Sequence, residues 1–322
     1  QNAGRMVELL KANDLNNNIA LLVSSKIETQ KGDFQKAIDV LADVEGNSAL
    51  LIERARCKIE LALFESAQKD IELAVKKNKI TLEENKLMAK TYYGLKKYDE
   101  ALIFCEASIA FHPTAEDYCL RGMIYSKRNE VEEATEDYRK AIDLVPSYKE
   151  AYYELGKLQF ENNQFENAAS NLNKAEELGA HSVELYLVLA ESYIQVKDFP
   201  AAIAPLKKIE KIEPENKKML ENMGIAYFGQ EAYSEANEYF SKRIGYKTSN
   251  PYLAMYYAMS LHFSHSYTNA ILYYEQAITL FNDSKEHKKW ISFCKNAVKE
   301  CKKERQDILS ELDEIYIFPI DF

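Results

Sequence analysis

The chain has 322 residues, with 41 Lys and Arg against 51 Asp and Glu and a formal net charge of −10 at pH 7. This balance argues against nucleic-acid binding, which depends on clustered Lys and Arg that neutralise phosphates, and no stretch approaches the roughly 20 apolar residues of a membrane-spanning helix. The low content of Gly (10) and Pro (7) favours an all-α fold, since these residues weaken a helix interior by roughly 1 and 3 kcal/mol.

Residues 1–17 are interpreted as an N-terminal cap. Apolar Met6, Val7, Leu9 and Leu10 precede a polar, Asn-rich stretch, which indicates a short helix and a turn. Because the sequence begins with Gln rather than Met, we expect that a signal segment has been removed or that the chain has been trimmed. The localisation stays open between cytoplasmic and exported or periplasmic.

Residues 18–282 carry a repeat of 30 to 34 residues that is anchored by an alanine. A small residue stands twelve positions before each alanine, an aromatic or branched apolar residue three before, and a larger apolar residue four after. These spacings place the side chains on the facing surfaces of two helices, whose close approach requires the small residues. A repeat of this length predicts stacked helical hairpins. The eight alanines are Ala37, Ala67, Ala101, Ala134, Ala168, Ala202, Ala236 and Ala270.

The repeat resembles the tetratricopeptide repeat family. The resemblance rests on the small residue of the first helix, a Tyr three positions later, the alanine of the second helix and a Pro that closes the unit. The first unit is the weakest, with Ser24 and Ser25 at apolar positions, and Ile209 and Arg243 replace a residue that is small in other units. The matching residues are Tyr92, Tyr125, Tyr193, Tyr227, Pro113, Pro146 and Pro214.

The resemblance implies a right-handed superhelical α-solenoid of about eight helix-turn-helix repeats. In that family the first helices line the concave side, with the second, fifth, ninth and twelfth positions of each unit facing inward. From the fourth unit onward this inward set is unusually apolar, which favours a groove for a peptide or a helix; packing of these side chains on neighbouring first helices is the alternative. The predicted groove residues are Lys86, Lys90, Tyr93, Met123, Tyr153, Lys157, Phe160, Leu187, Glu191, Ile194, Glu221, Phe228, Met255, Met259 and His262.

The middle units are the most acidic part of the chain. Residues 115–191 contain 16 Asp and Glu against 8 Lys and Arg, so a cationic partner is favoured there. Solvation of the convex face is the simpler interpretation of the same charges.

Residues 283–322 are interpreted as a C-terminal capping helix followed by an apolar tail. The pattern over 284–315 predicts one long helix with an apolar face that includes Trp290 and closes the exposed end of the array. A basic amphipathic helix also suits an anionic membrane surface or an acidic partner. The tail at 317–322 either folds back or docks elsewhere, which leaves self-association through it open.

No catalytic constellation emerges from the sequence. The phosphate-binding, dinucleotide-binding, nucleophile-elbow and metalloprotease motifs are missing, and the five cysteines form no C-x-x-C pair. His262 and His265 have the spacing of a metal pair without a third ligand in the sequence, so a polar groove wall is the preferred interpretation. We expect no enzyme activity, metal or cofactor.

The leading hypothesis is a non-catalytic scaffold for protein–protein interaction, with a protein or peptide ligand in the concave groove of its C-terminal half. An exported cell-envelope or carbohydrate-binding module is the alternative, because exposed tyrosines can stack on sugars. An enzyme with an unrecognised site is the third possibility.

Overall fold

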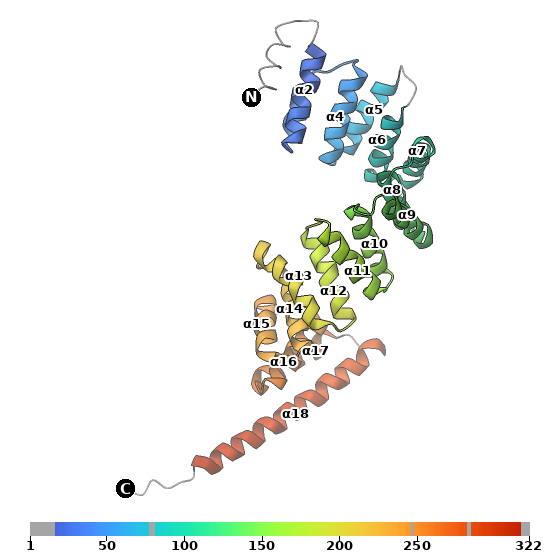
Figure 1. The fold of residues 1–322 in the computed structure, drawn as a ribbon. Helices are drawn as coiled ribbons and strands as arrows, with labels where there is room; N and C mark the ends of the chain where they lie inside the picture. Colours follow the sequence, from blue (N-terminus) through green and yellow to red (C-terminus); the bar gives the residue numbers. More distant parts are fainter. Residues whose placement is uncertain (1–16, 77–80, 246–247, 282–284, 317–322) are drawn as a thin grey trace. The chain divides into compact units, whose positions relative to one another are not determined.

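The computed structural model describes residues 17–76, 81–245, 248–281 and 285–316 (Figure 1). Every regular element within these ranges is an α-helix, and the expected all-α fold of stacked helical repeats is confirmed. The chain divides into two compact units, unit 1 (Gln1–Leu158) and unit 2 (Gln159–Phe322). Residues 1–16 of the predicted cap (1–17) and the tail at 317–322 lie outside the described residues.

Unit 1 is built from helices that pack in consecutive pairs, α2 with α3, α4 with α5, α6 with α7 and α8 with α9. The first helices of neighbouring pairs are also in contact: α2 contacts α4, and α4 contacts α6. The helices are α2 (Asn17–Gln30), α3 (Phe34–Val40), α4 (Ser48–Glu60), α5 (Phe64–Val75), α6 (Leu82–Gly94), α7 (Tyr98–Phe111), α8 (Ala115–Lys127), α9 (Val131–Leu144) and α10 (Lys149–Glu161), whose last turn belongs to unit 2.

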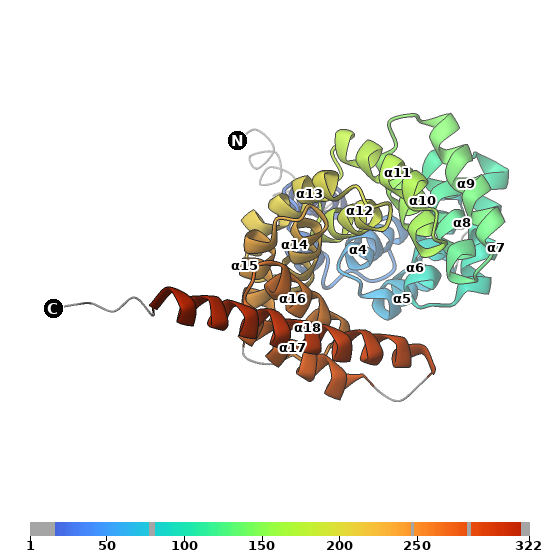
Figure 2. The same cartoon turned by 90° about the horizontal axis from the view of Figure 1, so that it is seen from below.

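Unit 2 continues the pairing and ends in one long helix. Its elements are α11 (Phe165–Glu177), α12 (Val183–Gln195), α13 (Phe199–Ile212), α14 (Lys217–Gly229), α15 (Tyr233–Ile244), α16 (Pro251–Phe263), α17 (Tyr267–Leu280) and α18 (Lys285–Tyr316). The N-terminal half of α18 packs on α17, burying Cys294, Ala297 and Cys301, and the helix then runs on past α17 (Figure 2). The long C-terminal helix predicted from the sequence is present.

The small residues permit the close helix contacts that the repeat predicted. All eight anchoring alanines have an exposed fraction of 0%. A Cβ atom added to Gly122 would lie 2.7 Å from the ring of Tyr138, and one added to Gly224 would lie 2.5 Å from the ring of Phe240. Both distances are below van der Waals contact, so in these two hairpins the helices meet where the first helix offers only a hydrogen.

The departures from the small-residue pattern are accommodated in different ways. Ile209 is fully buried among its neighbours. Arg243 instead turns toward Glu221, with 3.6 Å between guanidinium nitrogen and carboxylate oxygen, and its Nε atom is buried without a hydrogen-bond partner.

The five cysteines are all buried and free. Burial raises the pKa of Cys105 to about 12, and it raises the pKa values of Cys294 and Cys301 to about 11. These thiols therefore stay protonated at neutral pH, and they fill apolar space in the core.

The turn inside each hairpin holds one residue in the left-handed backbone region. Gly32 takes this position in the first hairpin, with a φ of 79°. The later hairpins place residues with a side chain there, with φ between 55° and 64°. Such a conformation costs a residue other than Gly roughly 1–2 kcal/mol. The residues are Ala62, Lys96, Asn129, Asn163, Lys197, Glu231 and His265.

We therefore expect Lys197→Gly to stabilise the protein. The φ of 63° at Lys197 is free of strain for Gly, and this gain exceeds the entropy that Gly adds to the unfolded chain, so the free energy of unfolding should rise by about 0.5–1 kcal/mol. Guanidinium denaturation measures the change. Lys197→Val is the control and should destabilise, because β-branched residues tolerate this region poorly; a loss of stability in the Gly variant would contradict the strain argument.

Candidate functional site

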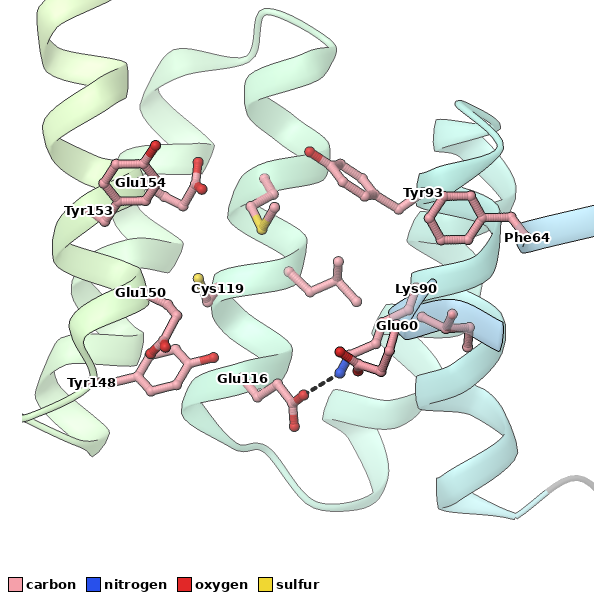
Figure 3. A pocket seen from close by; sticks show the side chains of 13 residues that line it. Glu60, Phe64, Lys90, Tyr93, Glu116, Cys119, Tyr148, Glu150, Tyr153 and Glu154 are labelled. Carbon is pink, nitrogen blue, oxygen red and sulfur yellow. Dashed lines mark hydrogen bonds and ion pairs between the residues drawn. The ribbon is translucent and has the colours of Figure 1, made fainter. Parts of the chain in front are cut away.

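A hollow of about 380 Å³ opens on unit 1, between the first helices of its hairpins (Figure 3). Helices α4, α6, α8 and α10 each contribute side chains, joined by Phe64 at the start of α5 and Tyr148 just before α10. The first helices supply these residues because each hairpin repeats the same geometry, so equivalent positions line up from one unit to the next. The hollow has the size of a small-ligand or side-chain pocket.

The floor of the hollow is apolar. Cys119 and Leu120 on α8 are 3% and 9% exposed, and Met123 and Tyr93 are half-buried beside them. Burial raises the pKa of Tyr93 to about 12, with the carboxylate of Glu154 as the next cause. The phenol and the thiol at the floor are therefore neutral near pH 7, and the floor can accept apolar groups.

The rim of the hollow is acidic. Four carboxylates line it, those of Glu60, Glu116, Glu150 and Glu154, together with one ammonium, that of Lys90. The Lys90 Nζ atom donates to Glu116 Oε1 at 2.5 Å (Figure 3), so the cation of the rim is engaged with one of its own carboxylates.

Lys86 and Lys157 lie next to the hollow and have contacts within unit 1. The Lys86 Nζ atom is 3.1 Å from Asp117 Oδ2 and 3.2 Å from Thr114 Oγ1. Thr114 and Asp117 form a capping box at the start of α8, so Lys86 ties α6 to α8. Lys157 places its Nζ atom 5.1 Å from the ring centre of Tyr153.

Among the groove residues predicted in unit 1, Lys90, Tyr93, Met123 and Tyr153 therefore meet at one hollow. Glu116 and Glu150, which are not among the predicted groove residues, also line it. A signal for them existed, because they lie 34 residues apart and at the second position of their units, which the family resemblance places on the inward side.

The predicted groove residues at the start of unit 2 make local contacts. Phe160 meets Phe165 edge to face, with 5.6 Å between ring centres. Glu191 on α12 accepts hydrogen bonds from Lys218 and Asn222 of α14, at 3.0 and 3.2 Å. Leu187 and Ile194 are half-buried on the same helix.

Two predicted groove residues near the end of unit 2, Met255 and Phe228, pack on neighbouring side chains. Met255 is 2% exposed and belongs to the core formed by α15, α16, α17 and α18; its expected place on an open wall is corrected, because neighbouring helices bury it. Phe228 contacts the rings of Tyr233, Tyr256 and Phe263.

Three further residues of this set are held by side-chain contacts in unit 2. Glu221 faces Arg243, and Met259 packs against the core of the last hairpins. His262 Nε2 lies 3.1 Å from Glu304 Oε2 of α18, while His265 contacts the Tyr267 hydroxyl. Within the described ranges, no group of three or more His, Cys, Asp or Glu side chains is arranged to hold a metal ion.

Comparison with known proteins identifies the repeat. A family model described as "TPR repeat" matches residues 122–163, and one described as "Tetratricopeptide repeat" matches residues 153–217. The structure of YrrB, described as a TPR protein with an unusual peptide-binding site, is similar to the chain with a TM-score of 0.52 and 18% identity, over 56% of this chain and 93% of that one. The chain contains tetratricopeptide repeats.

Two further solved structures share the fold of this tetratricopeptide repeat protein. PilW, a type IV pilus biogenesis factor, has a TM-score of 0.55 and 17% identity, over 64% of this chain and 97% of its own. PilF of Pseudomonas aeruginosa has a TM-score of 0.52 and 16% identity, over 66% and 96%. At these identities the likeness concerns the fold alone. No curated protein sequence matches the chain significantly.

Tetratricopeptide repeats are scaffolds for protein–protein interaction and are generally non-catalytic, so the partners of the chain are proteins. Among the helices of the described residues, none combines the length and the apolar character needed to cross a membrane.

Proposed function

We propose that this tetratricopeptide repeat protein holds a peptide segment of a protein partner in the hollow of unit 1. The observation that carries the proposal is the combination of a concave apolar floor with half-buried aromatic side chains from several helices. A water-facing wall of this kind favours an apolar guest, because covering it removes apolar surface from water. The proposed peptide site therefore lies in unit 1, whereas the apolar inward positions of the sequence favoured a site in the C-terminal half of the chain.

The chemistry of the lining supports binding rather than catalysis. Cys119 is the one thiol in the lining, and burial, followed by the nearby carboxylates, raises its pKa. A protonated and buried thiol is a poor nucleophile. The hydroxyl of Tyr93 is likewise held neutral, so the lining offers contact surface and hydrogen bonds.

Filling the hollow tests the proposal. Peptides are selected from a random phage-displayed library on the wild-type protein, and their affinities are measured by fluorescence polarisation. Met123→Trp adds bulk over the floor, and we expect it to weaken the selected peptides at least about tenfold, because the apolar contact is lost. The matched control is Met259→Trp, which changes the same position of a repeat in unit 2 and should leave binding unchanged.

Two results would count against the proposal. Equal binding to the Met123→Trp protein, with unchanged thermal stability, would place the peptides elsewhere. Failure to select any peptide, together with binding on a glycan array, would favour the carbohydrate-binding alternative.

A further inference from the structure

The rim of the hollow carries more negative than positive charge, even when neighbouring cations are counted. Glu60, Glu116, Glu150 and Glu154 provide four carboxylates. Lys90 and the adjacent Lys157 provide two ammonium groups, and Lys90 is paired with Glu116. The third neighbouring cation, Lys86, is paired with Asp117, and these two charges cancel. The local charge is thus two minus four, or −2, next to an apolar floor. Glu60 and Glu150 are both exposed, so a guest can reach them.

The negative potential extends to the floor of the hollow. Burial is the first cause that raises the pKa of Cys119, and Glu154, Glu150 and Glu116 are the following causes. The pKa of Tyr148 is raised by burial and then by Cys119 and by Glu116 and Glu150. Carboxylates from α8 and α10 therefore act on the same apolar space. Because apolar walls lower the local dielectric, this field favours a cation more strongly than an open surface would.

The tyrosines of the hollow supply a second feature that suits a cation. Tyr93, Tyr148 and Tyr153 line it together with the carboxylates. Aromatic faces attract ammonium and guanidinium groups, and the contact of Lys157 with the Tyr153 ring shows one such pair within the chain itself. Met123, Leu120 and Ile59 leave apolar surface between these polar groups.

We propose that the peptide held in the hollow of unit 1 carries a Lys or Arg flanked by apolar residues, with the cation on the acidic rim that includes the exposed carboxylates of Glu60 and Glu150, and the apolar neighbours on the floor at Met123. The inference rests on the proposed function and specifies its ligand. An acidic or phosphorylated segment is repelled by the same rim, since like charges at an interface disfavour the wrong partner.

The peptides selected on the wild-type protein provide the first test. Their sequences should be enriched in a Lys or Arg between Leu, Met or aromatic residues. A synthetic peptide of a selected sequence should lose at least about tenfold in affinity when its cation is replaced by Gln. Its binding should also weaken as the salt concentration rises, because salt screens exposed charges.

The double variant Glu60→Gln/Glu150→Gln provides the second test. It removes two exposed charges and keeps the shape of the side chains, so we expect the Lys- or Arg-containing peptide to bind about tenfold more weakly, with a smaller dependence on salt. The matched control is Glu132→Gln/Glu133→Gln, which removes two exposed charges from α9 outside the lining, and should bind like the wild type.

The outcomes separate this inference from the proposed function. Neutral selected peptides that lose affinity for Met123→Trp but not for the double variant would overturn the cationic ligand and keep the peptide site. Peptides that ignore both changes, or a library that yields none, would overturn both.

Discussion

Replacing Asp70 by Ala is expected to lower the free energy of unfolding of the N-terminal hairpins by about 3–5 kcal/mol, because it leaves buried cations without a partner. The carboxylate of Asp70, whose side chain is 5% exposed, accepts two hydrogen bonds from Arg54 at 2.8 and 2.9 Å and one from Lys58 at 2.7 Å. Arg54 also donates to the carbonyl oxygens of Leu41 and Ala42 in the preceding hairpin. The carboxylate thus fixes a cation that joins two repeats.

Hydrogen exchange resolved by residue measures this effect where it occurs. In a repeat array the loss concentrates on the altered hairpin and its neighbours, so amides of α4 and α5 should lose protection while those of α14 and α15 keep it. The triple variant Arg54→Met/Lys58→Met/Asp70→Leu removes the whole ionic cluster and should recover most of the stability, since a buried ion pair is often replaceable by apolar residues. An Asp70→Ala protein as stable as the wild type would show that the cluster contributes little.

A second Arg–Asp pair of the same kind occurs two hairpins later, between Arg121 and Asp137. Arg121 donates to Asp137 at 2.6 and 2.9 Å, and both pairs join residues 16 apart. This spacing is visible in the sequence, but it lies outside the small and apolar positions that define the repeat. The corresponding residues of the hairpin between them are Met88 and Phe104, so the ionic pair is an addition to the repeat and not part of its signature.

The hairpins could be predicted because they depend on local spacing. A small residue and an alanine at fixed positions place two helix faces together, and the anchoring alanines are buried as that pattern requires. The exposure of the inward positions could not be predicted in the same way. Tyr153 and Met255 occupy the same position of their repeats, yet Tyr153 lines the hollow and Met255 is buried.

The difference between these two residues arises from packing between distant segments. Met255 lies in a core to which α18 contributes Cys294 and Cys301, and His262 meets Glu304, 42 residues further along the chain. A single repeat pattern contains no information on such contacts. It therefore assigns Tyr153 and Met255 the same environment, although Tyr153 lines the hollow and Met255 is buried.

Replacing Phe240 by Ala is expected to lower the free energy of unfolding by about 3–5 kcal/mol. Phe240 has an exposed fraction of 0% and lies in the core of the last hairpins, with its ring centre 5.9 Å from that of Tyr257. The Phe240 ring lies against Gly224 of the paired helix, where it occupies the space that a side chain at position 224 would need. A methyl group cannot fill the space of the ring, so the substitution leaves a cavity. Guanidinium denaturation followed by circular dichroism measures the loss.

A double-mutant cycle on Phe240 and Gly224 tests whether the loss of stability comes from the close fit of the ring against the glycine or only from the loss of buried apolar surface. Gly224→Ala alone brings a Cβ to within 2.5 Å of the ring, and the resulting strain of roughly 1–3 kcal/mol should outweigh the gain of about 1 kcal/mol in helix propensity. In Gly224→Ala/Phe240→Leu the smaller side chain removes the clash, so the double variant should be more stable than the sum of the two single changes predicts, by at least about 0.5 kcal/mol. The equivalent cycle on Gly122 and Tyr138 in unit 1 should show coupling of the same sign, because the added Cβ would lie 2.7 Å from that ring. Strictly additive losses in both cycles would mean that the helices adjust their separation freely, and that the glycines do not set it.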